Sequence, residues 1–83
     1  MSKIEIYTRP GCGYCSAARN LLKTRSLTFA EYDVYALPEK KTELSARINY
    51  STYPQIFIDG KPIGGFDDLA LLDRQVNLHM SFS

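Results

Sequence analysis

The segment TRPGCGYCSAARNLL, residues 8–22, contains both cysteines of the chain, Cys12 and Cys15. Before it, residues 3–8 alternate between polar and apolar side chains, which is typical of a β-strand. After the cysteines, residues 16–23 carry alanines and leucines at helical spacing, which indicates an amphipathic helix. The two thiols therefore stand where a strand ends and a helix begins, and a C-x-x-C pair in that position is typical of thiol redox chemistry.

The position of Cys12 favours an ionised thiol. At a helix N-terminus the free N–H groups of the first turn and the positive end of the helix dipole stabilise a thiolate. Such sites lower the pKa of a cysteine from about 8.5 to about 3.5–7.5. Arg9, three residues upstream, adds positive charge. Cys15 follows one turn later on the same helical face, and we expect it to be the more buried and less ionised thiol. The pattern predicts attack by Cys12 and resolution by Cys15.

Three other interpretations of the pair are open to the sequence alone. A structural disulfide would close so short a loop that it stabilises the fold by only about 2 kcal/mol. A zinc site needs four ligands, and the one further candidate is His79, far away near the C-terminus. Two cysteines that merely pack in a core would need neither this spacing nor a helix start. Redox chemistry is the favoured interpretation.

The remaining pattern predicts an α/β fold. After the first strand and helix it indicates a strand, a helix, two strands and a helix: residues 29–34, a helix opening at 37–39, residues 55–59, residues 61–63, and a helix from Asp67-Asp68 to Val76. A strand–helix–strand unit places its two strands parallel with a right-handed crossover. The dipeptide Asp59-Gly60 is typical of a hairpin turn. We therefore expect a mixed sheet with helices on both faces.

Composition and charge exclude several classes of protein. The chain has 83 residues, 45% hydrophobic and 23% charged, which fits one globular domain, residues 1–83. A net charge of +1 without a basic stripe argues against nucleic-acid binding. No apolar run approaches the roughly 20 residues of a membrane span. The N-terminus has no leader pattern, and two cysteines are too few for a secreted disulfide scaffold, so we expect a cytoplasmic protein.

Three segments, IYTRPGCGYC (6–15), TYPQIFIDG (52–60) and IGGFDDL (63–69), resemble the glutaredoxins in their order and spacing, across nearly the whole chain. The resemblance implies a thioredoxin-like fold, with a four-stranded mixed sheet in the order 2-1-3-4 and three helices on both of its faces. It implies a glutathione-dependent oxidoreductase that reduces protein–glutathione mixed disulfides and protein disulfides. Glutathione would be the reductant, ribonucleotide reductase is one candidate protein partner, and we expect a monomer.

The resemblance also implies a glutathione site. Arg9 would meet the glycine carboxylate, and Pro54 would follow a cis peptide bond that turns the backbone of Tyr53 toward the cysteines. The N–H groups of Phe66 and Asp67 would hold the γ-glutamyl carboxylate, and the Asp67 side chain would accept the adjacent ammonium group. The full implied set is Arg9, Tyr14, Thr52, Tyr53, Pro54, Gly65, Phe66, Asp67 and Asp68.

The chain departs from the family pattern at three positions. Tyr53 stands where Val usually precedes the proline, and Phe66 where relatives often have Cys. Gly13 stands where dithiol members most often have Pro, and it is similar to the monothiol branch. That residue suggests an alternative function, a [2Fe–2S] carrier in which Cys12 from each of two subunits and two glutathiones hold the cluster. A redoxin served by a thioredoxin reductase is a further alternative, although the implied glutathione site would then have no ligand.

Overall fold

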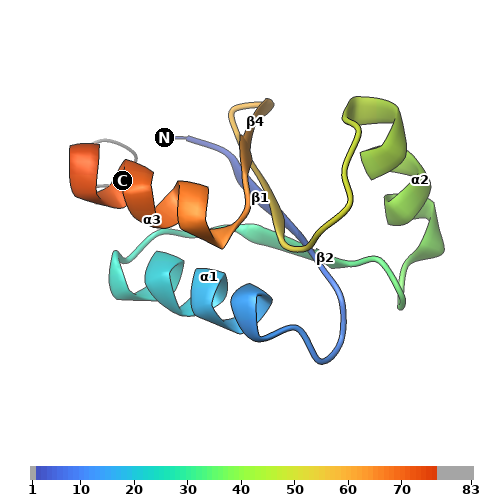
Figure 1. Ribbon diagram of the computed structural model, residues 1–83, viewed down its shortest axis with the longest axis horizontal. Coiled ribbons are helices and arrows are strands. Elements are labelled where there is room, and N and C mark those ends of the chain that lie inside the picture. Colours follow the sequence, from blue (N-terminus) through green and yellow to red (C-terminus); the bar gives the residue numbers. More distant parts are fainter. Residues whose placement is uncertain (1, 77–83) are drawn as a thin grey trace.

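Seven elements follow one another in the predicted order in the computed structural model, which describes residues 2–76 (Figure 1). Their bounds are β1 (Ile4–Thr8), α1 (Gly13–Thr24), β2 (Ala30–Asp33), α2 (Pro38–Arg47), β3 (Gln55–Ile58), β4 (Lys61–Gly64) and α3 (Phe66–Val76). His79 lies outside the described residues. No helix within residues 2–76 is long and apolar enough to cross a membrane.

The four strands form one mixed sheet in the order β2-β1-β3-β4. β1 pairs in parallel with β2 and antiparallel with β3, and β3 and β4 form an antiparallel hairpin. Asp59 and Gly60 turn this hairpin with positive φ angles of 52° and 81°, as an Asp-Gly dipeptide in a type I′ turn requires. The expected strand order 2-1-3-4 is confirmed.

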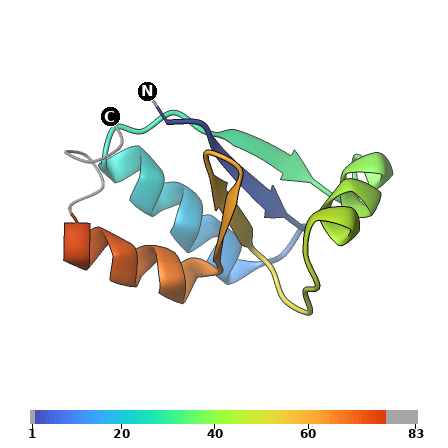
Figure 2. The ribbon, with the colours of Figure 1, turned by 90° about the horizontal axis from the view of Figure 1, so that it is seen from above.

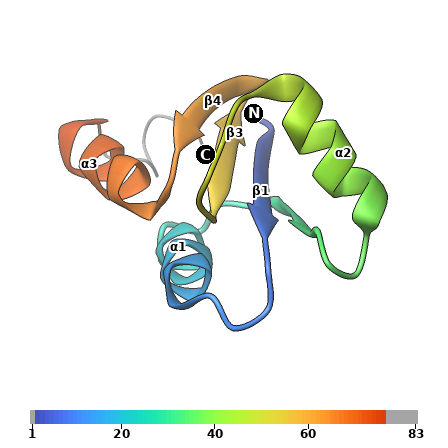
Figure 3. The ribbon, with the colours of Figure 1, turned by 45° about the vertical axis from the view of Figure 1, so that its right-hand side comes forward.

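The helices cover both faces of the sheet, as predicted. α1 and α3 lie together on one face and α2 lies on the other (Figures 2 and 3). The first face carries the larger apolar cluster, built from the two helices and the central strands: Ile4, Ile6, Ala18, Leu22, Leu27, Ile56, Ile58 and Leu69. The face under α2 carries a smaller cluster: Tyr7, Val34, Leu44 and Phe57. All five residues of β1 are buried because this central strand is covered on both sides.

The starts of two helices bear on the candidate site. α1 begins at Gly13, directly after Cys12, whose side chain caps its first turn as the position of this cysteine predicted. α3 begins at Phe66, one residue before the expected start at Asp67, and Asp67 and Asp68 lie in its first turn. β4 ends at Gly64, one residue beyond the expected range 61–63. Both α1 and α3 begin at the same end of the fold (Figure 2).

Candidate active site

Cys12 is the N-cap residue of α1. Its backbone is extended, with φ −94° and ψ 110°, and its Sγ accepts a hydrogen bond of 3.2 Å from the backbone N–H of Cys15. On its other side the Cys12 thiol donates to the carbonyl oxygen of Tyr53, 3.6 Å away. Cys12 is partly exposed, whereas Cys15 is completely buried, and both are free thiols. The predicted difference in burial between the two cysteines is present.

The surroundings shift the pKa values of the two thiols in opposite directions. Burial opposes ionisation of Cys12, but the hydrogen bonds from Cys15, the N–H of Tyr14 and the charge of Arg9 outweigh it and lower the pKa of Cys12. Burial raises the pKa of Cys15 to about 11, and its hydrogen bond with Cys12 adds to the increase. One thiol is therefore prepared to attack and the other is held protonated, which suits a nucleophile and a resolving thiol.

A groove of about 260 Å³ lies beside the cysteines, between the loop before β3 and the start of α3. Its lining consists of eight of the nine residues of the implied glutathione site: Tyr14, Thr52, Tyr53, Pro54, Gly65, Phe66, Asp67 and Asp68. The Tyr53–Pro54 peptide bond is cis, as the resemblance implied. The ring of Tyr14 is exposed and stacks on that of Phe66, with centroids 6.3 Å apart. Three segments that are far apart in sequence thus meet at one groove.

The ninth residue, Arg9, lies at the adjoining hollow around Cys12. This hollow has a volume of about 360 Å³ and shares Tyr14, Thr52 and Tyr53 with the first groove. The Arg9 Cζ stands 5.8 Å from the centroid of the Tyr53 ring, within the range of a cation–π contact. The sequence had not singled out Gly11 and Ser51, which also line this hollow, and their types carry no signal of a site.

Asp67 and Asp68 differ in what they contact. The Asp68 side chain accepts a hydrogen bond of 3.0 Å from the backbone N–H of Gly65, which closes the N-terminus of α3 as the third residue of a capping box does. A side chain at Gly64 would clash with the Asp68 carboxylate, and the φ of 114° at Gly64 is itself a conformation that favours glycine. The exposed Asp67 makes no such bond among the interactions within residues 2–76. Asp68 therefore shapes the groove wall, and Asp67 is the carboxylate available to a ligand.

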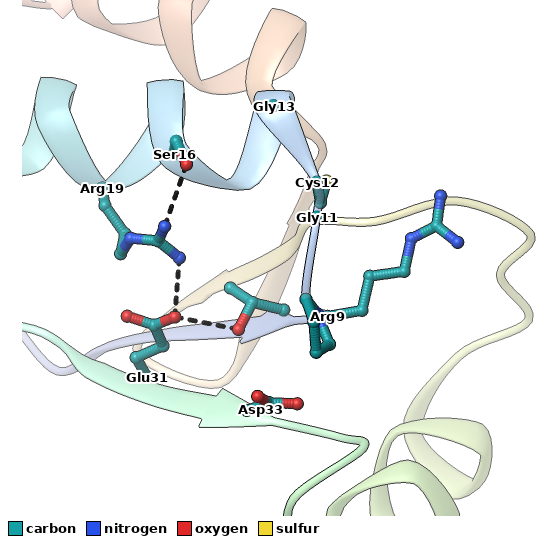
Figure 4. Close-up of a pocket in the computed structure, with 10 residues that line it drawn as sticks. Arg9, Gly11, Cys12, Gly13, Ser16, Arg19, Glu31 and Asp33 are labelled. Atoms are coloured by element: carbon teal, nitrogen blue, oxygen red, sulfur yellow. Dashed lines mark hydrogen bonds and ion pairs between the residues drawn. The ribbon is translucent and has the colours of Figure 1, made fainter.

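A third hollow, of about 470 Å³, lies on the α1 and β2 side of Cys12 (Figure 4). Its wall is held by Glu31, whose Oε2 accepts from Arg19 Nη1 at 2.8 Å and from the Thr8 hydroxyl at 2.9 Å. Arg19 also donates to Ser16 Oγ at 3.0 Å. Sequence reasoning missed this cluster because its members come from three elements. Arg9 extends away from it, toward the loop before β3.

Comparison with known proteins agrees with this geometry. The family "Glutaredoxin" matches residues 4–63, which include the cysteines and the cis-proline. The chain belongs to the glutaredoxin family. The resemblance seen in the sequence is thereby confirmed, and so is the coarse activity, since glutaredoxins are thiol–disulfide oxidoreductases that use glutathione.

Individual glutaredoxins match over most of their length. Glutaredoxin 3 of Escherichia coli (strain K12) is 41% identical over 78 residues, 94% of each chain. The solution structure of glutaredoxin from Brucella melitensis is 42% identical with a TM-score of 0.75, and the match covers 94% of this chain and 85% of that one. A buckwheat glutaredoxin–glutathione complex, 24% identical with a TM-score of 0.81 over 93% and 74% of the two chains, shares the fold.

The side chains of residues 2–76 do not form a metal site by themselves. Among residues 2–76 no group of three or more His, Cys, Asp or Glu side chains could hold a metal ion. Cys15 is fully buried, which leaves Cys12 as the one accessible thiolate. A cluster bound at Cys12 would therefore need its other ligands from outside residues 2–76.

Proposed function

We propose that this chain reduces protein–glutathione mixed disulfides, and protein disulfides, with glutathione as reductant. The observation that carries the proposal is the position of Cys12. Its Sγ, with a lowered pKa, opens onto a groove lined by residues at which the family resemblance implies a glutathione site. The family membership supports the thiol–disulfide chemistry, and the groove supports glutathione as the partner.

The reaction begins with the Cys12 thiolate. It attacks the glutathione sulfur of a mixed disulfide, and the protein thiolate leaves and takes up a proton. A second glutathione, as thiolate, then attacks the Cys12-bound glutathione sulfur, which releases oxidised glutathione and restores the Cys12 thiolate. With a protein disulfide as substrate, Cys12 forms the mixed disulfide and Cys15 attacks Cys12. The protein leaves reduced, and two glutathiones then reduce the Cys12–Cys15 disulfide.

In this proposal the groove and the adjoining hollow around Cys12 give each charged end of glutathione a partner. Arg9 provides a cation for the glycine carboxylate. The backbone of Tyr53 can pair with the tripeptide as an added strand does, and Tyr14 and Thr52 flank it. The N–H groups of Phe66 and Asp67 at the start of α3 favour the γ-glutamyl carboxylate, and the Asp67 side chain can accept the ammonium group.

A [2Fe–2S] carrier formed by two copies is the second candidate, and Gly13 is the observation that favours it. A side chain at this position would meet nothing within 4 Å, so the surface beside Cys12 is open. Anaerobic reconstitution with iron, sulfide and glutathione tests it. Visible absorption from a dimer that disappears in Cys12→Ser would support the carrier, and a colourless monomer would exclude it.

The decisive experiment measures turnover of a glutathione mixed disulfide, with NADPH consumption followed through glutathione reductase. Rapid turnover that depends on glutathione is the expected result. Absence of turnover by folded, reduced protein would overturn the proposal. The remaining alternative is a redoxin served by a thioredoxin reductase. Replacing glutathione and its reductase with a thioredoxin reductase tests it, because such a redoxin would then reduce a protein disulfide.

A further inference from the structure

We propose that Tyr53 is a positioning residue, whose aromatic ring holds the Arg9 guanidinium beside Cys12 and the glutathione groove. The glycine-carboxylate part of this role rests on the function proposed above. The effect of Arg9 on Cys12 involves only residues of this chain, so it can be measured without a substrate.

Arg9 has little else to hold it. It follows the last residue of β1, is exposed, and extends away from the Arg19–Glu31 pair (Figure 4). Within the described part of the chain, no carboxylate forms an ion pair with Arg9, although four other Arg or Lys side chains do have carboxylate partners. Its contact is the ring of Tyr53, with Cζ 5.8 Å from the centroid. A long, exposed side chain without such a contact would sample many rotamers.

The side chain of Tyr53 is itself held in place by its neighbours. Its side chain packs against the apolar cluster under α2. Its ring meets that of Tyr50 edge-on at 5.5 Å, and its hydroxyl donates to the Tyr50 hydroxyl at 3.2 Å. The ring is thus a rigid support, anchored on the opposite side of the sheet from α1. The Val that usually occupies this position in the family has no π face and could not attract a guanidinium.

The backbone carbonyl and the ring of Tyr53 both act on the site around Cys12. Its backbone carbonyl accepts from the Cys12 thiol at 3.6 Å, while its ring contacts the cation that helps to lower the pKa of Cys12. Because the Arg9 side chain is already held near Cys12 and near the proposed site for the glycine carboxylate, it loses less conformational entropy when the ligand binds. Tyr53 therefore couples Arg9 to both Cys12 and the bound substrate.

A double-mutant cycle between the two residues tests this inference. Tyr53→Leu keeps an apolar side chain but removes the π face, Tyr53→Phe keeps the face but removes the hydroxyl, and Arg9→Gln removes the cation. All are made in Cys15→Ser protein, so that iodoacetamide reports on Cys12. The rate of alkylation against pH gives the pKa of Cys12, and the coupled assay gives KM for the mixed disulfide.

We expect Tyr53→Leu to raise the pKa of Cys12 and to raise KM by about two- to fivefold, the ratio that an exposed cation–π contact supports. Tyr53→Phe should recover the pKa of the parent protein, because the ring face is intact. In the Arg9→Gln background, Tyr53→Leu should change neither quantity further. Lys23→Gln removes a cation from the far end of α1 and should leave the pKa of Cys12 unchanged.

Two results would overturn the inference. One is a pKa of Cys12 that Tyr53→Leu leaves unaltered. The other is an effect of Tyr53→Leu that persists in full without Arg9, which would mean that the ring acts only through packing. If the parent protein fails to turn over glutathione mixed disulfides, the proposed function is wrong, yet the alkylation cycle still decides the coupling of Tyr53 to Arg9. Circular dichroism of each variant confirms that the fold is retained.

Discussion

The backbone N–H of Cys15 donates a 3.2 Å hydrogen bond to the Sγ of Cys12, so the residue whose thiol is expected to resolve the reaction also stabilises the charge of the attacking thiol. The bond exists because Cys12 occupies the N-cap and Cys15 the third position of α1, the geometry that a C-x-x-C spacing produces at a helix start. The same turn that buries Cys15 therefore stabilises the thiolate of Cys12.

Alkylation by iodoacetamide should distinguish the two thiols by pH. The pKa of Cys12 is lowered and that of Cys15 is raised to about 11. Below pH 8 we expect one fast-reacting thiol in the folded protein, located at Cys12 by peptide mass analysis, while Cys15 stays unmodified until the pH nears 11. Equal labelling of both cysteines at neutral pH in folded protein would contradict this assignment. Protein unfolded in urea, where both residues should react alike, is the control.

Replacement of each cysteine by serine should separate two activities. Cys12→Ser removes the nucleophile and should abolish reduction of every disulfide substrate. Cys15→Ser should retain reduction of glutathione mixed disulfides, where a second glutathione attacks, but lose dithiol reduction of protein disulfides. The coupled assay measures the first activity. Reduction of a reporter protein disulfide, followed by fluorescence or turbidity, measures the second. Loss of both activities in Cys15→Ser, with the fold retained, would mean that the roles are assigned wrongly.

The local features of this site could be predicted from the sequence. The C-x-x-C at a strand-to-helix junction indicated the cap at Cys12, and the Asp59-Gly60 dipeptide indicated the hairpin. Both depend on neighbours within a few residues, so the chain's local chemistry determines them. The cysteines lie beside the loop before β3 and beside α3 because of the strand order of the sheet. This arrangement was expected only from the family resemblance.

Contacts between distant side chains could not be predicted. Glu5 is buried within β1, where an alternating pattern predicts an exposed residue, because Arg47 and Tyr32 from two other elements bind its carboxylate. The ring of Tyr53 likewise finds its partners in Arg9 and Tyr50. A polar residue is tolerated in a buried position only with its partners, and those partners are known only when the chain is folded.

The paired aspartates at the start of α3 should respond differently to substitution. Asp68→Ala removes the hydrogen bond to the N–H of Gly65 and should lower the free energy of unfolding by about 1 kcal/mol, the usual effect of a lost helix cap. Asp67→Ala removes no such bond, so it should leave stability nearly unchanged and instead raise KM for the glutathione mixed disulfide. Urea unfolding and the coupled assay measure the two effects. The assignment is wrong if the two variants exchange their effects.

Tyr7 should contribute to stability through its hydroxyl, on the face of the sheet that α2 covers. Its hydroxyl donates to Glu43 Oε1 at 2.6 Å and accepts from Arg47 Nη1 at 2.9 Å, and these two residues attach α2 to the sheet. Tyr7→Phe keeps the ring in the cluster with Phe57 but leaves both partners short of a bond, so it should lower the free energy of unfolding by about 1–3 kcal/mol. Activity should be retained, and Tyr35→Phe, at an exposed position, is the control that should leave stability unchanged.

The pH dependence of stability provides a second measure of Tyr7. Burial, and then the bond to Glu43, raise its pKa from 10.0 to about 12. Between these values the unfolded chain has lost the phenol proton while the folded chain retains it, so the unfolded state binds fewer protons and stability falls as pH rises. The contribution is complete below pH 10 and is lost as the pH passes 12. Tyr7→Phe should therefore unfold with a shallower dependence on pH in this window than the parent chain, and an identical slope would show that this hydroxyl titrates equally in both states.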